Sequence, residues 1–151
     1  MPSSRVLFDT NVLIRASSPG DPRRIDAIAA IRKLQMGGAT LCICAQNMQE
    51  YRQVATRSQE ANGLGMTSAD VALATNDFER AYELVPDTAA VYHVWRRIVE
   101  NVGAIGRANY DARIVAMAEA NAIDSVLTYE AAAFQRYGTV SGVTILDPSA
   151  L

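Results

Sequence analysis

The sequence predicts an α/β fold in which helices cover both faces of a mostly parallel sheet. Short apolar runs alternate along the chain with longer segments whose apolar residues recur at helical spacing. The short runs are apolar throughout, rather than alternately apolar and polar, which is typical of strands that are buried on both faces. A length of 151 residues fits a single domain that spans residues 1–151.

Local patterns justify the individual elements. Asp21 and Pro22 predict the start of a helix, because Asp is a favoured N-cap and Pro is favoured at the first helical position. Ile25, Ile28 and Ile31 then recur at helical spacing. In chain order, the expected elements are a strand at 6–8, a helix at 22–36, a strand at 40–44, helices at 46–57 and about 67–82, a strand at 83–85, helices from 87 and at 110–120, a strand at 125–128, a helix at 130–137 and a strand at 143–146.

Charge and composition narrow the classes of function. A net charge of −2, from 14 basic and 16 acidic residues, disfavours a protein that binds nucleic acid through phosphate contacts alone. It does not disfavour an enzyme whose carboxylates surround metal ions, because the cations supply local positive charge. No apolar run approaches the roughly 20 residues of a membrane helix, and the first residues do not resemble a signal peptide, so we expect a cytoplasmic protein. Cys42 and Cys44 are expected to be buried thiols on one face of a strand.

Several acidic residues fall where one edge of the predicted sheet would collect them. Asp9 ends the first strand, Glu50 lies in the helix after the second strand, and Asp111 lies in the first turn of a later helix. Glu130 follows the strand at 125–128. Clustered carboxylates repel one another, so such a cluster is tolerated mainly around a divalent cation, and oxygen ligands favour Mg²⁺ or Mn²⁺ over zinc. Such an ion activates water for attack on a phosphodiester without a protein nucleophile.

Each acid also has a simpler structural explanation. Asp9 could cap a helix that begins near Asn11, and Asp111 could complement a helix N-terminus. Glu50 and Glu130 could be solvated surface residues, which is the commonest fate of a glutamate. Other catalytic patterns are absent from the sequence, which has one histidine, no nucleophile elbow and no glycine-rich phosphate loop.

Four segments, in order, resemble the motifs of PIN domains. The first contains Asp9-Thr10-Asn11 after an apolar strand, and the loop at 62–65 is similar to that of a bacterial subgroup described as VapC-like. The four segments are residues 6–13, 49–57, 110–116 and 126–148. The resemblance therefore spans nearly the whole chain.

This resemblance implies a three-layer α/β/α sandwich, Mg²⁺- or Mn²⁺-dependent ribonuclease activity on RNA, and frequent homodimers. VapC members are toxins that pair with an antitoxin, which covers the active site. By the resemblance, the catalytic metal ligands are Asp9, Glu50 and Asp111. Residues that would orient the site through hydrogen bonds are Thr10, Asn11 and Thr128.

One position departs from the PIN pattern. PIN domains usually carry a fourth acid, often immediately before a phenylalanine, and here Ala133 precedes Phe134. Glu130 is a candidate replacement ligand and equally a candidate surface residue. Ala133 motivates a second reading, a catalytically weak or inactive PIN module that binds RNA or a partner protein. A third and weaker reading is a phosphoryl-transfer protein with Asp9 as nucleophile, which lacks the expected second Asp two residues later.

Some side chains have two readings. Core packing is expected for Trp95 and is the default for Tyr110, Tyr129 and Tyr137, although such tyrosines could stack on bases. Three arginines could contact phosphate, namely Arg57, Arg107 and Arg113. A solvated surface position is the simpler reading for Arg57 and Arg107. Arg113 is the exception, and it lies two residues after Asp111, so it projects from a different side of the helix.

Overall fold

The computed structural model describes residues 4–151, and this part of the chain folds around a five-stranded sheet. All strand pairs are parallel, in the order β3-β2-β1-β4-β5. The strands are β1 (Arg5–Phe8), β2 (Thr40–Ile43), β3 (Glu83–Leu84), β4 (Ser125–Leu127) and β5 (Thr144–Leu146). This sheet confirms the predicted α/β class.

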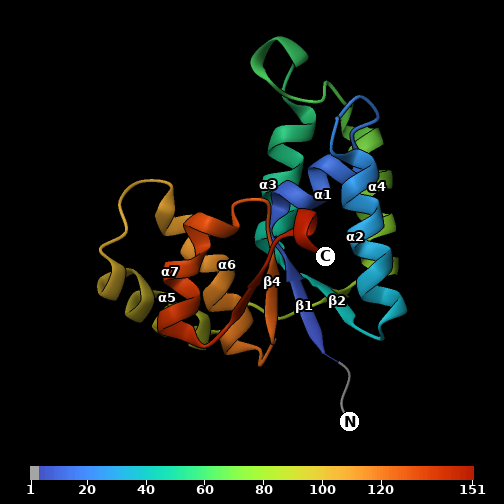
Figure 1. Ribbon diagram of the computed structural model, residues 1–151. Coiled ribbons are helices and arrows are strands. Elements are labelled where there is room, and N and C mark those ends of the chain that lie inside the picture. Colours follow the sequence, from blue (N-terminus) through green and yellow to red (C-terminus); the bar gives the residue numbers. More distant parts are fainter. Residues whose placement is uncertain (1–3) are drawn as a thin grey trace.

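Helices cover both faces of the sheet. Figure 1 shows α5, α6 and α7 on one side of the strands and α1, α2 and α4 on the other. The helices are α1 (Thr10–Ser17), α2 (Arg24–Met36), α3 (Ala45–Thr56), α4 (Ser68–Ala81), α5 (Ala89–Val102), α6 (Ala108–Ala120) and α7 (Ala131–Ser141), with short 3₁₀ helices at Gln59–Ala61 and Pro148–Ala150. Within residues 4–151, none of these helices combines the length and the apolar character needed to span a bilayer.

The two faces of the sheet explain why the strands are apolar throughout. Val6 and Phe8 of β1 pack with residues of α1 to α4, whereas Leu7 between them packs with α5, α6 and α7. Successive side chains of a strand point to opposite faces, so both sets must be apolar when both faces are covered. Cys42 and Cys44 lie together in the second of these cores, buried and unbridged, as predicted.

Helix starts account for most differences from the sequence-based expectation. The helix predicted from Pro22 begins at Arg24, because the backbone N–H of Arg24 donates to the Asp21 carbonyl at 3.1 Å and closes a turn over residues 22 and 23. Ile25, which the helical spacing places with Ile28 and Ile31, is 80% exposed. The helix predicted from Asp87 begins at Ala89, after a separate N-cap at Thr88.

Two aromatic residues are less buried than expected. Trp95 is half-buried and lies at the border of a core, and Tyr110 is 65% exposed rather than packed inside. Tyr137 is buried, as expected, and Tyr129 is half-buried. The exposed Tyr110 directly precedes Asp111.

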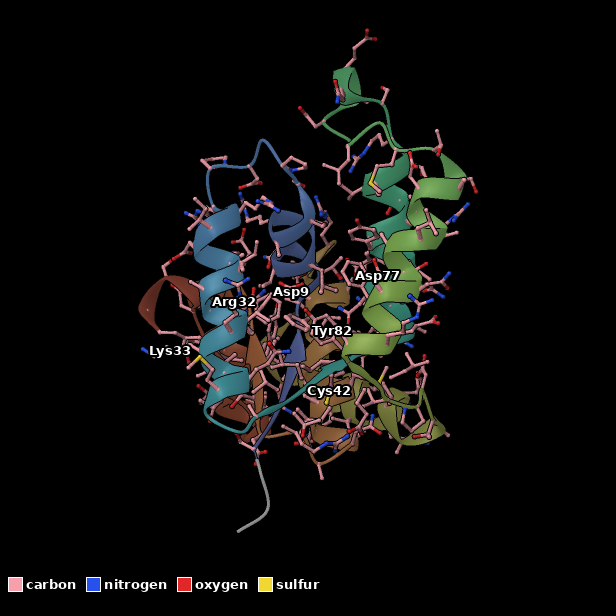
Figure 2. All side chains as sticks on the ribbon, turned by 90° about the vertical axis from the view of Figure 1, so that its right-hand side faces the viewer. Asp9, Arg32, Lys33, Cys42, Asp77 and Tyr82 are labelled. Carbon is pink, nitrogen blue, oxygen red and sulfur yellow. The ribbon has the colours of Figure 1, made fainter. Side chains whose placement is uncertain are left out.

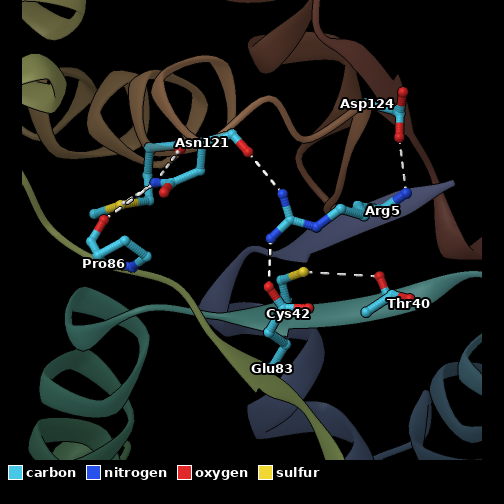
Figure 3. Close-up of polar contacts among 8 residues, drawn as sticks. Arg5, Thr40, Cys42, Glu83, Pro86, Asn121 and Asp124 are labelled. Atoms are coloured by element: carbon cyan, nitrogen blue, oxygen red, sulfur yellow. Dashed lines mark hydrogen bonds and ion pairs between the residues drawn. The ribbon is translucent and has the colours of Figure 1, made fainter. Parts of the chain in front are cut away.

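Arg5 ties three elements together at the N-terminal end of the sheet (Figure 3). Its backbone N–H donates to Asp124 Oδ2 at 2.8 Å. Its guanidinium donates to the carbonyl of Asn121 at 2.7 Å and to Glu83 Oε1 at 2.5 Å. This network joins β1 to β3 and to the loop before β4, at the edge opposite the acidic residues.

Candidate functional site

Three of the four predicted acids lie at the carboxyl edge of the sheet. Asp9 directly follows β1, Glu50 lies in the second turn of α3, and Asp111 lies in the first turn of α6. The negative charges of Glu50 and Asp111 both raise the pKa of Asp9, so the three carboxyl groups are close enough to interact. The parallel sheet creates this meeting point, because the carboxyl ends of its strands share one edge.

Asp9 is the most buried of the three, with 7% of its surface exposed. Figure 2 places it in the interior of the molecule, whereas Asp77 and Lys33, which are exposed, lie on outer helices. Burial, together with the charges of Asp111 and Glu50, raises the pKa of Asp9 to about 7, although the Thr128 hydroxyl opposes this shift by donating to Asp9 Oδ2 at 2.7 Å.

The capping explanation for Asp9 is not supported. Asp9 occupies the N-cap position of α1, yet its side chain makes no capping hydrogen bond. The carboxylate turns instead toward Thr128, which lies beyond β4. A carboxyl group that is buried without a partner of opposite charge is stabilised either by a proton or by a cation.

Glu50 and Asp111 are half-buried. Burial raises the pKa of Glu50, Gln46 lowers it through a side-chain hydrogen bond, and Asp111 raises it by charge repulsion. Burial also raises the pKa of Asp111, whereas the positive charge of Arg107 lowers it. Both carboxyl groups therefore share the electrostatic environment of Asp9.

Hydrogen bonds fix the polar residues around Asp9. Thr128 Oγ1 accepts from the backbone N–H of Glu130 at 2.9 Å and from Asn11 Nδ2 at 3.4 Å. Asn11 Oδ1 in turn accepts from the backbone N–H of Tyr129 at 3.3 Å. The Thr10 hydroxyl donates to Glu50 Oε1 at 3.5 Å. The structure thus brings Thr10, Asn11 and Thr128 to the acidic residues.

Two further residues belong to this frame and are not singled out by the sequence. Asn47 is fully buried, accepts from the backbone N–H of Cys44 at 2.9 Å and donates to the carbonyl of Phe8 at 2.9 Å. Gln46 donates to the carbonyl of Tyr110 at 3.0 Å and so links α3 to α6. The sequence signal that could have found them is a pair of adjacent polar residues shortly after an apolar strand.

Glu130 is exposed and interacts with one of the three acids, Asp111. Its charge raises the pKa of Asp111, and its side chain makes no capping hydrogen bond to α7. Ala133, where PIN domains usually have an acid, is exposed as well. Glu130 therefore lies near Asp111 at the exposed margin of the three acids.

The carboxylates are better placed to hold a hydrated hard cation than to enclose a metal ion completely. Within residues 4–151, no three His, Cys, Asp or Glu side chains converge closely enough to enclose a metal ion by themselves. Mg²⁺ usually keeps several waters and is held through one or two carboxylates, so full convergence is not required. Carboxylate oxygens with raised pKa values are the matching chemistry, because a cation stabilises the charged form that burial disfavours.

A family comparison identifies the fold type. The model of the PIN domain matches residues 6–139, which is most of the chain. The chain belongs to the PIN-domain family. PIN domains are typically nucleases, so this membership supports a hydrolase.

Solved structures resemble this PIN domain over nearly its full length. The VapBC2 complex of Rickettsia felis, bound to a DNA fragment from its promoter, matches with a TM-score of 0.69 and 16% identity, covering 95% of this chain and 98% of that chain. FitAcB of Neisseria gonorrhoeae matches with a TM-score of 0.63 and 17% identity, covering 97% and 99%. VapBC-1 of nontypeable Haemophilus influenzae matches with a TM-score of 0.69 and 14% identity, covering 96% and 98%. A search of curated proteins gave no match to the sequence.

Proposed function

We propose that this PIN domain is a divalent-metal-dependent endoribonuclease and the toxin of a toxin–antitoxin pair. The observation that carries the proposal is the meeting of Asp9, Glu50 and Asp111 at the carboxyl edge of the sheet, with the pKa of all three raised by burial. The PIN family and the similarity in fold to VapBC and FitAcB support the same conclusion. We expect a cytoplasmic protein, in keeping with an RNA substrate.

Each residue of the site has a role that follows from its position. Asp9, Glu50 and Asp111 would hold Mg²⁺ or Mn²⁺, with Glu130 as a further candidate. Such an ion, when bound, lowers the pKa of a water molecule and neutralises charge on the phosphate. Thr128 keeps the Asp9 carboxylate in place through its 2.7 Å hydrogen bond, and Thr10 and Asn11 complete that frame.

Two arginines beside the carboxylates suit a phosphate-containing substrate. Arg107 and Arg136 are exposed, and the positive charge of each lowers the pKa of Asp111. A guanidinium group donates in a planar fork that matches phosphate oxygens. These side chains compensate locally for the net charge of −2, which by itself disfavours RNA binding.

An apolar groove supports an antitoxin partner. The groove has a volume of about 250 Å³ and lies between α1, α2 and α4, with walls that include Leu13, Ile31 and Phe78. The similar structures include complexes named VapBC and FitAcB, and we propose that a segment of a separate antitoxin chain fills this groove. A homodimer remains a prediction from the family resemblance, and sedimentation velocity of the purified protein would check it.

The first experiment combines metal binding with RNA cleavage. Mn²⁺ would be titrated by calorimetry into the wild type and into the Asp9→Asn, Glu50→Gln, Asp111→Asn and Glu130→Gln variants. We expect Mn²⁺ binding and Mn²⁺-dependent cleavage of RNA by the wild type, and loss of both in the first three variants. The Asp77→Asn variant, at an exposed position on α4, is the matched control and should behave as the wild type.

The result also separates the main alternative. Ala133 and the open arrangement of the carboxylates favour, as a second candidate, a PIN module that binds RNA or a protein without cutting RNA. A wild-type protein that binds no Mn²⁺ and leaves RNA intact would replace the nuclease proposal by this one. A Glu130→Gln variant with normal Mn²⁺ affinity would place Glu130 outside the ligand set.

A further inference from the structure

A cavity of about 560 Å³ lies beside the acidic site, on the side of α5 and α6. Its walls include the aromatic rings of Tyr92, Trp95 and Tyr110. Polar groups of Asp87, Asn109 and Arg113 complete them. A volume of this size and a wall of aromatic rings with a few polar groups are typical of small-molecule sites.

The cavity wall is linked to the helices that carry the carboxylates. Tyr110 precedes Asp111 in α6, and its carbonyl accepts a hydrogen bond from Gln46 Nε2 at 3.0 Å. Gln46 Oε1 accepts from Arg113 Nη1 at 3.0 Å, and Arg113 also pairs with Asp87 on the cavity wall. Gln46 lies one turn before Glu50 and lowers its pKa through a side-chain hydrogen bond. Gln46 thus links the cavity wall to α3, the helix that carries Glu50.

The aromatic rings are arranged to receive a flat group. The indole N–H of Trp95 donates to the carbonyl of Asn109 at 2.6 Å, which fixes the ring and satisfies its polar atom. The rings of Tyr92 and Trp95 lie 6.0 Å apart at 36°, so they do not stack closely on each other. Tyr92 is 52% exposed and Tyr110 is 65% exposed, although aromatic side chains are usually covered in a folded domain.

We propose that this cavity binds a base of single-stranded RNA next to the phosphodiester that lies at the carboxylates. The proposal rests on the proposed ribonuclease function and adds to it a substrate subsite. Bases of single-stranded RNA stack on aromatic side chains, whereas bases in a duplex are inaccessible to such a cavity. Arg107 follows Gly106 of the cavity wall, and its positive charge acts on Asp111, so it is placed to attract the RNA backbone between the cavity and the carboxylates.

The single tryptophan of the chain is a built-in reporter, because Trp95 lies in the cavity wall. The experiment titrates a short single-stranded oligoribonucleotide into the protein in EDTA, where metal-dependent cleavage is blocked. Tryptophan emission reports occupancy of the cavity, and the anisotropy of a labelled oligoribonucleotide reports overall binding. An abasic oligonucleotide of equal length keeps the phosphates and removes the bases.

We expect saturable quenching of Trp95 by the single-stranded RNA and none by the abasic oligonucleotide or by the same RNA in a duplex. Tyr110→Ala should weaken RNA binding by about tenfold, within the range for one stacked base, and Tyr110→Phe should restore it. Leu73→Ala removes an equally exposed apolar side chain from α4 and should bind as the wild type.

Three results would overturn the proposal. RNA that binds without a change in Trp95 emission would place the bases elsewhere, and Tyr110→Ala with wild-type affinity would remove the ring from recognition. Trp95 emission that depends on protein concentration without RNA, together with a dimer that Tyr110→Ala dissociates, would assign the cavity to a second copy of the chain. Failure of this proposal is distinguishable from failure of the nuclease proposal, because Mn²⁺-dependent cleavage by the wild type is measured separately.

Discussion

Replacing Asp9 by Asn should stabilise the metal-free protein at pH 8, even though it should abolish the proposed activity. The pKa of Asp9 is about 7 in the folded protein, and its ordinary value is 3.8. The folded state therefore holds a proton that the unfolded chain releases at lower pH. Stability from this group is fully present below pH 3.8 and is lost as the pH rises through about 7.

The magnitude follows from the difference between the two pKa values. It corresponds to at most about 4 kcal/mol of unfolding free energy lost between pH 4 and pH 8. Asn keeps the shape of the side chain and still accepts the hydrogen bond from Thr128, but it carries no charge at either pH. Glu50 and Asp111 have pKa shifts in the same direction, so a weaker pH dependence should remain.

The assay is urea denaturation followed by circular dichroism, in EDTA, at pH 5 and pH 8. We expect the wild type to be less stable at pH 8 than at pH 5, and Asp9→Asn to exceed the wild type at pH 8. Asp77→Asn, at an exposed position, should leave both values unchanged. In a separate series without EDTA, added Mn²⁺ should stabilise the wild type and not Asp9→Asn, because a ligand stabilises only the state that binds it. A wild type equally stable at both pH values would refute this reasoning.

Three further substitutions have distinct expected outcomes. Thr128→Val removes the hydroxyl that donates to Asp9 at 2.7 Å, so the pKa of Asp9 should rise further, and Mn²⁺ affinity at pH 7, measured by calorimetry, should fall; unchanged affinity would show that this hydrogen bond is dispensable. Asn47→Ala leaves buried backbone groups without partners and should lower the unfolding free energy by about 2–4 kcal/mol in urea denaturation; a loss below 0.5 kcal/mol would contradict it. Gly63→Ala would place a Cβ 2.0 Å from the backbone carbonyl oxygen of Arg57, so the loop must shift, and limited proteolysis there should become faster; an unchanged cleavage rate would mean that the loop adapts without loss of order.

The sheet was the most predictable part of the fold. The strands around Leu7 and Val126 are short, apolar and followed by polar residues. These local properties are enough to predict a buried parallel strand. Helix starts were less predictable, because the residues after Asp21 can form either a turn or the first turn of a helix. The backbone N–H of Arg24 donates to the Asp21 carbonyl at 3.1 Å, so residues 22 and 23 form a turn and the helix begins at Arg24.

The candidate site was predictable as a set of acids but not as a geometry. Asp9 and Asp111 follow recognisable motifs, whereas the environment that raises the pKa of Asp9 depends on packing between distant elements. Gln46 illustrates the limit, because its role depends on Tyr110 and Arg113, which are more than 60 residues away. The exposure of Tyr110 is likewise a property of how α5 and α6 leave a cavity between them, and helical periodicity does not encode it.

The distribution of the three acids along the chain has a consequence for biosynthesis. Asp9 and Glu50 are made early, but Asp111 arrives only with α6, after more than two thirds of the 151 residues have been translated. Chains are synthesised from the N-terminus, so a chain that ends before residue 111 contains Asp9 and Glu50 but lacks the Asp111 carboxylate. For a nuclease that cuts RNA, such an order would delay activity until the chain is nearly complete, so the ribosome that makes the chain would not be exposed to an active site formed early in translation.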